Sequence, residues 1–155
     1  MIAHAGGSAD NPAVLIGHSL GGYLSLRAAV EHPRLVKALV LIATGPGFRD
    51  ATAREQWNRY ALSMDIGADA HPAARQLGVH GDGVVIEGLG SIRAPTLVIV
   101  GGEDRRFLAA KDYLVGGIPS ASGLVIAGAR HSVHKTHSAE VARAILSFLE
   151  ARALL

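Results

Sequence analysis

The chain contains no cysteine among its 155 residues. This absence excludes disulfide frameworks, thiolate metal sites and a cysteine nucleophile. Charged residues are also scarce, at 18% of the chain, and the formal net charge is only +2. Because the basic residues are scattered and form no stripe, we expect no nucleic-acid partner.

Long apolar runs are absent as well. Runs such as residues 38–43 are far too short to cross a bilayer. Residues 1–7 have neither the basic start nor the long apolar stretch of a signal peptide. We therefore expect a cytoplasmic protein with no membrane partner. Apolar residues nevertheless make up 49% of the chain, which is enough for the core of one compact domain.

The most informative segment is residues 12–22, with the sequence PAVLIGHSLGG. An apolar run leads into a Gly-x-Ser-x-Gly pattern at Gly17, Ser19 and Gly21, and helical spacing follows. A serine at the apex of such a turn has a strained backbone, and its neighbours must be almost free of side chains. The helix N-terminus beside it favours developing negative charge. The pattern predicts a nucleophilic serine; the alternative is a glycine-rich connector.

Strand and helix patterns alternate along the rest of the chain, which predicts an α/β fold with a mostly parallel sheet and flanking helices. The predicted strands are residues 13–16, 36–43, 96–100 and 123–127. The predicted helices are residues 20–31, 109–116 and 138–153. We expect Ser138 to cap the last helix, with Glu140 in its first turn.

The segment 49–93 interrupts this alternation. Four of its residues suggest an amphipathic helix: Trp57, Tyr60, Leu62 and Met64. At the C-terminal edge of a sheet such an insertion would form a short lid, and the alternative is that its apolar residues only dock it. We therefore divide the single domain 1–155 into a nucleophile half (1–48), a reduced lid (49–93) and an acid and histidine half (94–155).

A serine nucleophile needs a base and a third group that orients the base. Asp104 and His131 both follow predicted strands, and the carboxyl ends of parallel strands meet at one edge of a sheet. The chain order Ser19, Asp104, His131 is the order expected for an elbow serine in such a fold. Asp104 could instead be a turn or capping residue, in which case Glu103 would be the acid.

His131 also has rivals, since His134 and His137 follow at intervals of three residues. We expect these two histidines to be solvated or to cap the final helix. The spacing could suggest a metal site, but no carboxylate lies among the histidines, so none is expected.

Three motifs together resemble the α/β-hydrolase superfamily, in the branch of bacterial carboxylesterases, lipase-like enzymes and carbon–carbon bond hydrolases. They are GHSLGG at residues 17–22, GGED at 101–104 and GARH at 128–131. Residues 93–104 are also similar to the strand before the acid in that family. The resemblance covers nearly the whole chain.

The resemblance implies that Ser19 is the nucleophile, that His131 is the base and that Asp104 orients it. It also implies that the backbone N–H of Leu20 stabilises an oxyanion. No cofactor or metal is implied. Three further residues are candidates for contact with substrate: His18, Gly45 and Trp57.

The chain departs from the family pattern before its elbow. The family has about four strands there, whereas eighteen residues precede Ser19 in this sequence. We expect the loop that carries a second oxyanion donor to be absent, which would cost on the order of a hundredfold to a thousandfold in rate. Residues 4–7 (HAGG) lie too near the nucleophile strand to replace it.

The same departure is expected to leave the nucleophile strand at the edge of the sheet, where it could pair with another copy of the chain. Our preferred interpretation is the C-terminal portion of a longer hydrolase. The alternative is a complete chain that pairs its edge with a partner.

The sequence thus predicts a serine hydrolase that cleaves a small or medium carboxylic ester. One alternative is a carbon–carbon bond hydrolase or acyltransferase with the same three residues. The other is a catalytically impaired fragment that acts as an interaction or accessory module.

Overall fold

A computed structural model describes residues 2, 4, 6–64 and 72–155 of the chain. Its four strands form one parallel sheet in the order β1-β2-β3-β4. The strands are β1 (Ala13–His18), β2 (Val36–Ile42), β3 (Thr96–Gly101) and β4 (Ala121–Ile126). The predicted α/β class with a parallel sheet is confirmed.

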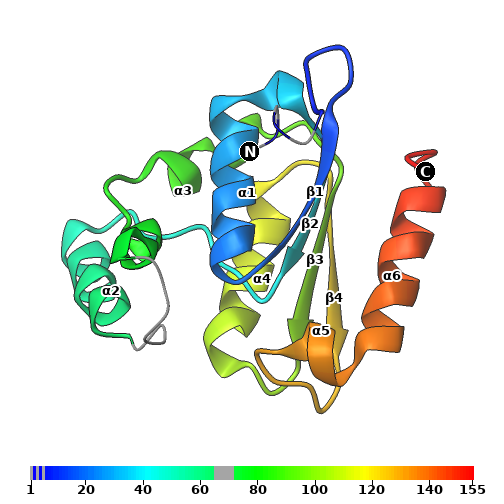
Figure 1. The fold of residues 1–155 in the computed structure, drawn as a ribbon. Helices are drawn as coiled ribbons and strands as arrows, with labels where there is room; N and C mark the ends of the chain where they lie inside the picture. The colour runs from blue at the N-terminus through cyan, green and yellow to red at the C-terminus, as the bar shows by residue number, and fades with distance from the viewer. Residues whose placement is uncertain (1, 3, 5, 65–71) are drawn as a thin grey trace.

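Helices cover both faces of this sheet. Helices α1 and α4 lie on one face and α6 on the other (Figure 1). The α-helices are α1 (Leu20–Glu31), α2 (Ala51–Ser63), α3 (Val84–Gly88), α4 (Arg105–Gly117), α5 (Val133–Thr136) and α6 (Ser138–Glu150). The 3-10 helices are η2 (Pro33–Leu35), η3 (Pro72–Gly78) and η4 (Leu89–Ser91).

The sheet separates two apolar clusters because side chains alternate between the faces of a strand. Leu39 and Leu41 of β2 pack on the α1 side, together with Leu26 of α1. Val40 of the same strand packs on the opposite side, together with Phe148 of α6. Since both faces of β2 are buried, the strand is apolar almost throughout, and this is why it could be predicted.

The predicted bounds agree with the structure for some helices and differ for others. Helix α1 has the predicted bounds, whereas α4 begins at Arg105, four residues before the predicted start. The backbone carbonyl of Asp104 accepts hydrogen bonds from the N–H groups of Phe107 and Leu108, so the helix starts directly after the turn. The N-cap position of the last helix falls on His137 and not on Ser138, with no side-chain capping bond, although Glu140 does lie in its first turn.

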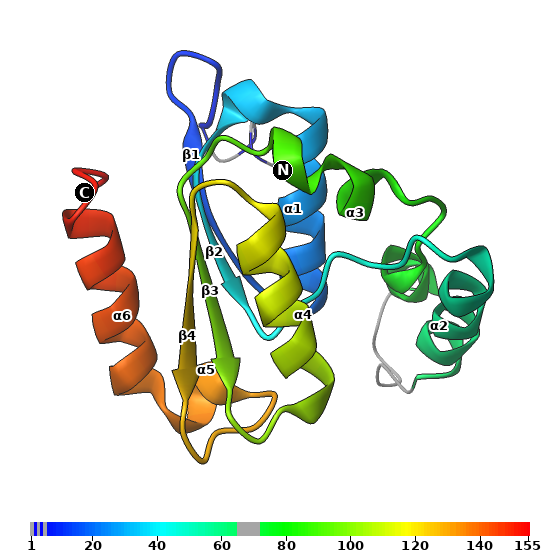
Figure 2. The same cartoon turned by 180° about the vertical axis from the view of Figure 1, so that it is seen from behind.

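The predicted lid segment forms α2, η3, α3 and η4, and its residues 65–71 lie outside the described residues. Seen from behind, α2 stands on the α1 side of the sheet and furthest from the strands (Figure 2). The expected apolar stripe of α2 is not a buried face. Trp57 is partly buried, whereas three of the four residues are exposed: Tyr60, Leu62 and Met64.

Strand β1 is an edge strand, as predicted, because among the described residues it pairs with β2 alone. Its Ile16 is 54% exposed, although it lies in the middle of the strand. No helix in the described part of the chain has both the length and the hydropathy needed to cross a membrane.

Candidate active site

Ser19 lies at the turn between β1 and α1 and has φ 51° and ψ −116°. A non-glycine residue with such a φ is strained by about 1–3 kcal/mol and persists only where its surroundings hold it. The Ser19 N–H donates to the carbonyl of Ile42, at 2.8 Å. The hydroxyl of Thr44 donates to the Ser19 carbonyl, at 2.7 Å. The last residue of β2 and Thr44, two residues later, therefore hold the backbone N–H and the backbone carbonyl of the strained serine.

Close packing of β1 against α1 explains part of the glycine pattern. A Cβ at Gly17 would overlap the backbone of Gly21, so only glycine fits. A Cβ at Gly22 would lie 2.6 Å from the Thr44 side chain, whereas one at Gly21 would meet open space. The expectation that both glycines flanking Ser19 must lack side chains is therefore wrong for Gly21, because the second close approach falls one residue later.

The structure brings Ser19, His131 and Asp104 together at the carboxyl ends of the strands. The His131 Nδ1 lies 2.9 Å from Oδ2 of Asp104, and its Nε2 lies 3.0 Å from the Ser19 Oγ. A carboxylate can only accept, so Nδ1 carries the proton and donates it to Asp104. In the neutral ring Nε2 is then the acceptor for the Ser19 hydroxyl. This arrangement can take a proton from Ser19.

The choice between the two neighbouring carboxylates follows from their partners. Asp104 is 8% exposed and binds His131, and its side chain does not cap α4. Glu103 is exposed and its Oε2 accepts from Nε of Arg130, at 3.1 Å. The geometry thus favours Asp104 over Glu103 as the group that orients the histidine.

Two aromatic rings flank His131. The ring of Phe107, on the first turn of α4, stacks on it with centroids 5.0 Å apart and an interplanar angle of 26°. The ring of His18 also contacts His131, with centroids 4.9 Å apart and an interplanar angle of 52°. Phe107 was missed in the sequence because nothing in its local pattern distinguishes it from an ordinary helix residue.

The two rival histidines lie elsewhere. The ring of His134, in α5, packs on His18 with centroids 4.1 Å apart, and its Nδ1 is buried without a hydrogen-bond partner among the described residues. The expectation that His134 is solvated or caps a helix is therefore wrong. His137 is the residue before α6, but its side chain bonds to Thr136 and does not cap the helix.

The predicted substrate contacts and oxyanion donor are placed as follows. Leu20 begins α1 directly after Ser19, at a helix end where N–H groups have no intrahelical acceptor. Gly45 lies against Phe107, the residue that stacks on His131. Trp57 instead lies within the insertion, where its Nε1 donates to the carbonyl of Gly78 at 3.0 Å.

His18 directly precedes Ser19, and its Nε2 lies 3.0 Å from the backbone carbonyl oxygen of His131. Burial lowers the pKa of His18 below its usual 6.5, and this outweighs the hydrogen bond to the His131 carbonyl, which raises it. The ring is therefore neutral at pH 7.

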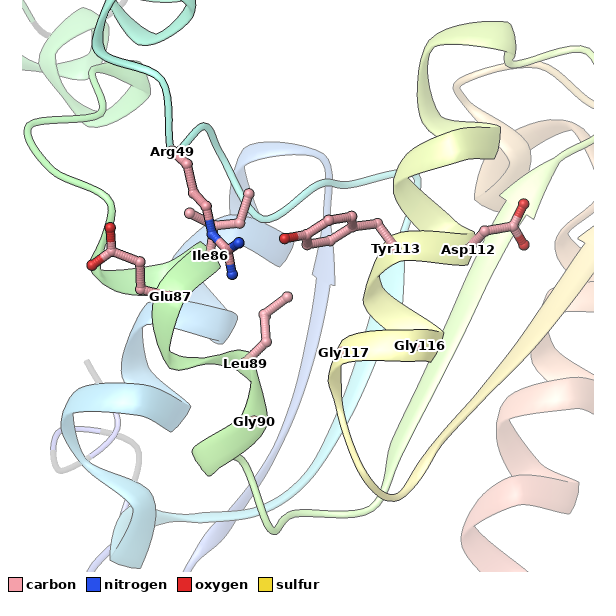
Figure 3. A pocket seen from close by; sticks show the side chains of 9 residues that line it. All are labelled: Arg49, Ile86, Glu87, Leu89, Gly90, Asp112, Tyr113, Gly116 and Gly117. Carbon is pink, nitrogen blue, oxygen red and sulfur yellow. The ribbon is translucent and has the colours of Figure 1, made fainter.

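A hollow of about 520 Å³ lies away from these residues, between α3 and α4. Tyr113 reaches across it from α4 toward Arg49 and Ile86 (Figure 3). None of the three hydrogen-bonded residues lines it. Among the residues that the structure describes, no group of three His, Asp, Glu or Cys side chains is placed to hold a metal ion.

Comparisons with known proteins concern the family and the fold. A family model described as alpha/beta hydrolase fold matches residues 8–79. The chain is 29% identical to pimeloyl-[acyl-carrier protein] methyl ester esterase of Chromobacterium violaceum over 185 residues, covering 92% of this chain and 72% of that protein. It is 32% identical to polyketide synthase ThaQ of Burkholderia thailandensis over 180 residues, covering 91% of this chain but only 9% of the synthase.

Among solved structures, MenH from S. aureus superimposes with a TM-score of 0.79 at 22% identity, covering 92% of this chain and 70% of MenH. Residues 8–79 thus match the alpha/beta hydrolase family, and the described residues have the fold of an α/β hydrolase.

Proposed function

We propose that the chain hydrolyses a small or medium carboxylic ester through an acyl-enzyme intermediate on Ser19. The observation that supports this most is the unbroken line of hydrogen bonds from Asp104 through His131 to the strained Ser19. Similarity to an esterase whose name specifies a methyl ester substrate also favours ester hydrolysis.

The reaction begins when the Ser19 Oγ attacks the ester carbonyl carbon and its proton passes to Nε2 of His131. Asp104 holds the resulting imidazolium through Nδ1. When the tetrahedral intermediate collapses, the Nε2 proton moves to the leaving alcohol and the acyl group stays on Ser19. A water molecule, deprotonated by Nε2, then attacks the acyl carbon. Carboxylic acid is released and the Ser19 hydroxyl is restored.

The oxyanion of the tetrahedral intermediate forms at the N-terminus of α1. There the Leu20 N–H donates to it, and the helix dipole adds to the stabilisation. A single donor would leave the rate on the order of a hundredfold to a thousandfold below that of a two-donor site.

The test is covalent labelling of the purified chain with a fluorophosphonate, which reacts with a serine that a base activates. Wild-type chain should label, and Ser19→Ala and His131→Ala should not. Ser25→Ala is the matched control, since Ser25 lies on α1 and its hydroxyl donates to the carbonyl of Gly21. This variant should label like the wild type.

A substrate panel then separates the reaction classes. It contains three esters (p-nitrophenyl acetate, butyrate and octanoate), an anilide, and a diketone that tests for carbon–carbon bond hydrolysis. Asp104→Asn should lower kcat/KM for the esters by about a hundredfold or more, because the histidine loses its orienting acceptor. Glu103→Gln should leave it unchanged. A folded wild-type chain that neither labels nor turns over an ester would overturn the proposal.

A further inference from the structure

Two hydrogen bonds connect the Ser19 turn to the loop that carries His131. The first joins the Ser19 Oγ to Nε2 of His131, at 3.0 Å. The second joins Nε2 of His18 to the backbone carbonyl oxygen of His131, also at 3.0 Å. Because a carbonyl can only accept, the His18 Nε2 carries the proton and donates it. Adjacent residues of one turn thus hold both the side chain and the backbone of the same histidine.

We propose that His18 is a positioning residue: its hydrogen bond to the His131 carbonyl fixes the distance between the histidine ring and the nucleophilic Ser19. This inference rests on the proposed function, since it concerns the same reaction. His18 does not touch the reacting atoms in this role. It acts through His131.

The position of the ring supports this role. His18 pairs with Ile42 of β2, in continuous register with the four residues of β1 before it, so its backbone is part of the sheet. Its ring packs between those of His131 and His134, with centroids 4.9 and 4.1 Å away. A side chain held on a strand end and between two rings is a more rigid anchor than one on a free loop.

The electrostatics are compatible with catalysis. The titratable groups that face His18 are His131, on the loop after β4, and His134 and Lys135, both on α5. Burial holds the pKa of His18 below its usual value, so the ring stays neutral at pH 7. A neutral donor holds the His131 loop without repelling the imidazolium that forms during the reaction.

The competing interpretation is that His18 contacts the substrate. The two roles separate in kinetics, because loss of a substrate contact raises KM, whereas misplacement of the base lowers kcat. The hydrogen bond also argues against substrate contact, since it engages the Nε2 proton of the ring.

The experiment compares two substitutions at His18 with a matched control in the full chain. His18→Phe keeps a ring between His131 and His134 but removes the donor, and His18→Gln retains an N–H at a similar reach. We expect His18→Phe to lower kcat by about tenfold to a hundredfold with unchanged KM, because a misplacement of about 1 Å can cost that much. His18→Gln should recover most of the rate. His32→Phe, at the exposed end of α1, should behave like the wild type.

Ring signals of His131, followed by NMR through a pH titration, provide a readout that needs no turnover. His18→Phe should change their shifts and their titration, and His32→Phe should not. Raised KM with unchanged kcat, or wild-type His131 signals in His18→Phe, would overturn the positioning role. An inactive wild-type chain would overturn the proposed function alone, since the NMR comparison still decides whether His18 holds His131.

Discussion

The turn that carries Ser19 depends on a few residues that cannot bear a side chain. Gly17 and Gly21 face each other across the crossing of β1 and α1, but only Gly17 directs its Cα hydrogen into the partner's backbone. Gly21 has open space at the corresponding position. The two glycines of the motif therefore differ. Gly17 is required for close packing, whereas the space around Gly21 would admit a side chain.

We predict opposite outcomes for alanine at these two positions. Gly17→Ala should lower the free energy of unfolding by at least about 3 kcal/mol or prevent folding, since its Cβ must displace the Gly21 backbone. Gly21→Ala, in the first turn of α1, should be neutral or stabilising by up to about 1 kcal/mol, because alanine favours a helix over glycine. Urea unfolding measures both changes. Equal losses in the two variants would contradict the steric argument.

At the scale of elements, His80 is one of the points at which the insertion contacts α1. The ring of His80 stacks on Tyr23 of α1, with centroids 3.9 Å apart at 13°. Asn58 of α2 binds the backbone of His80 twice, accepting from its N–H at 2.7 Å and donating to its carbonyl at 2.9 Å. Two residues on, Asp82 accepts from both terminal nitrogens of Arg27. His80 thus joins α2 to the sheet domain.

This junction should be sensitive to acid. Burial, helped by Arg54, lowers the pKa of His80 from 6.5 to about 4. The unfolded chain therefore binds the proton more tightly, so stability is complete above about pH 6.5 and falls as pH drops toward 4. Between pH 7 and pH 4.5, wild type should lose about 2 kcal/mol more than His80→Phe, which keeps the ring and removes the titration. Urea unfolding at the two pH values tests this, and an equal loss in both proteins would contradict it.

Patterns local in sequence predicted much of this molecule. The apolar runs of β2 and β3 indicated buried parallel strands, and polar residues at strand ends indicated that Ser19, Asp104 and His131 would lie near one another. The contact of His80 with Tyr23 could not be predicted in this way, since it joins residues far apart in the chain whose surroundings show no pattern. The same holds for Phe107, whose stacking on His131 depends on how α4 leaves β3.

At the scale of the whole molecule, the sheet has two edge strands, β1 and β4, and each exposes an apolar residue. On β1, Ile16 is 54% exposed, and the strand AVLIGH carries no acidic or basic residue apart from its terminal histidine. On the opposite edge, β4 exposes Val125 at 44%. Natural edge strands usually carry charges, bulges or covering segments that prevent pairing. Strand β1 has no acidic residue, lysine or arginine, and its pairing with β2 shifts register only at its start, between Ala13 and Val14.

We propose that a second copy of the chain pairs with β1 across a two-fold axis, because identical apolar edges are self-complementary when they run antiparallel. Ile16→Lys should then weaken self-association by at least about tenfold, since the interface would bring two buried lysines together. Sedimentation equilibrium over a range of concentrations measures the dissociation constant. Val125→Lys, on the other edge, is the matched control and should associate like the wild type. A wild-type chain that stays monomeric at every concentration, or equal weakening by both lysines, would show that β1 is not the contact.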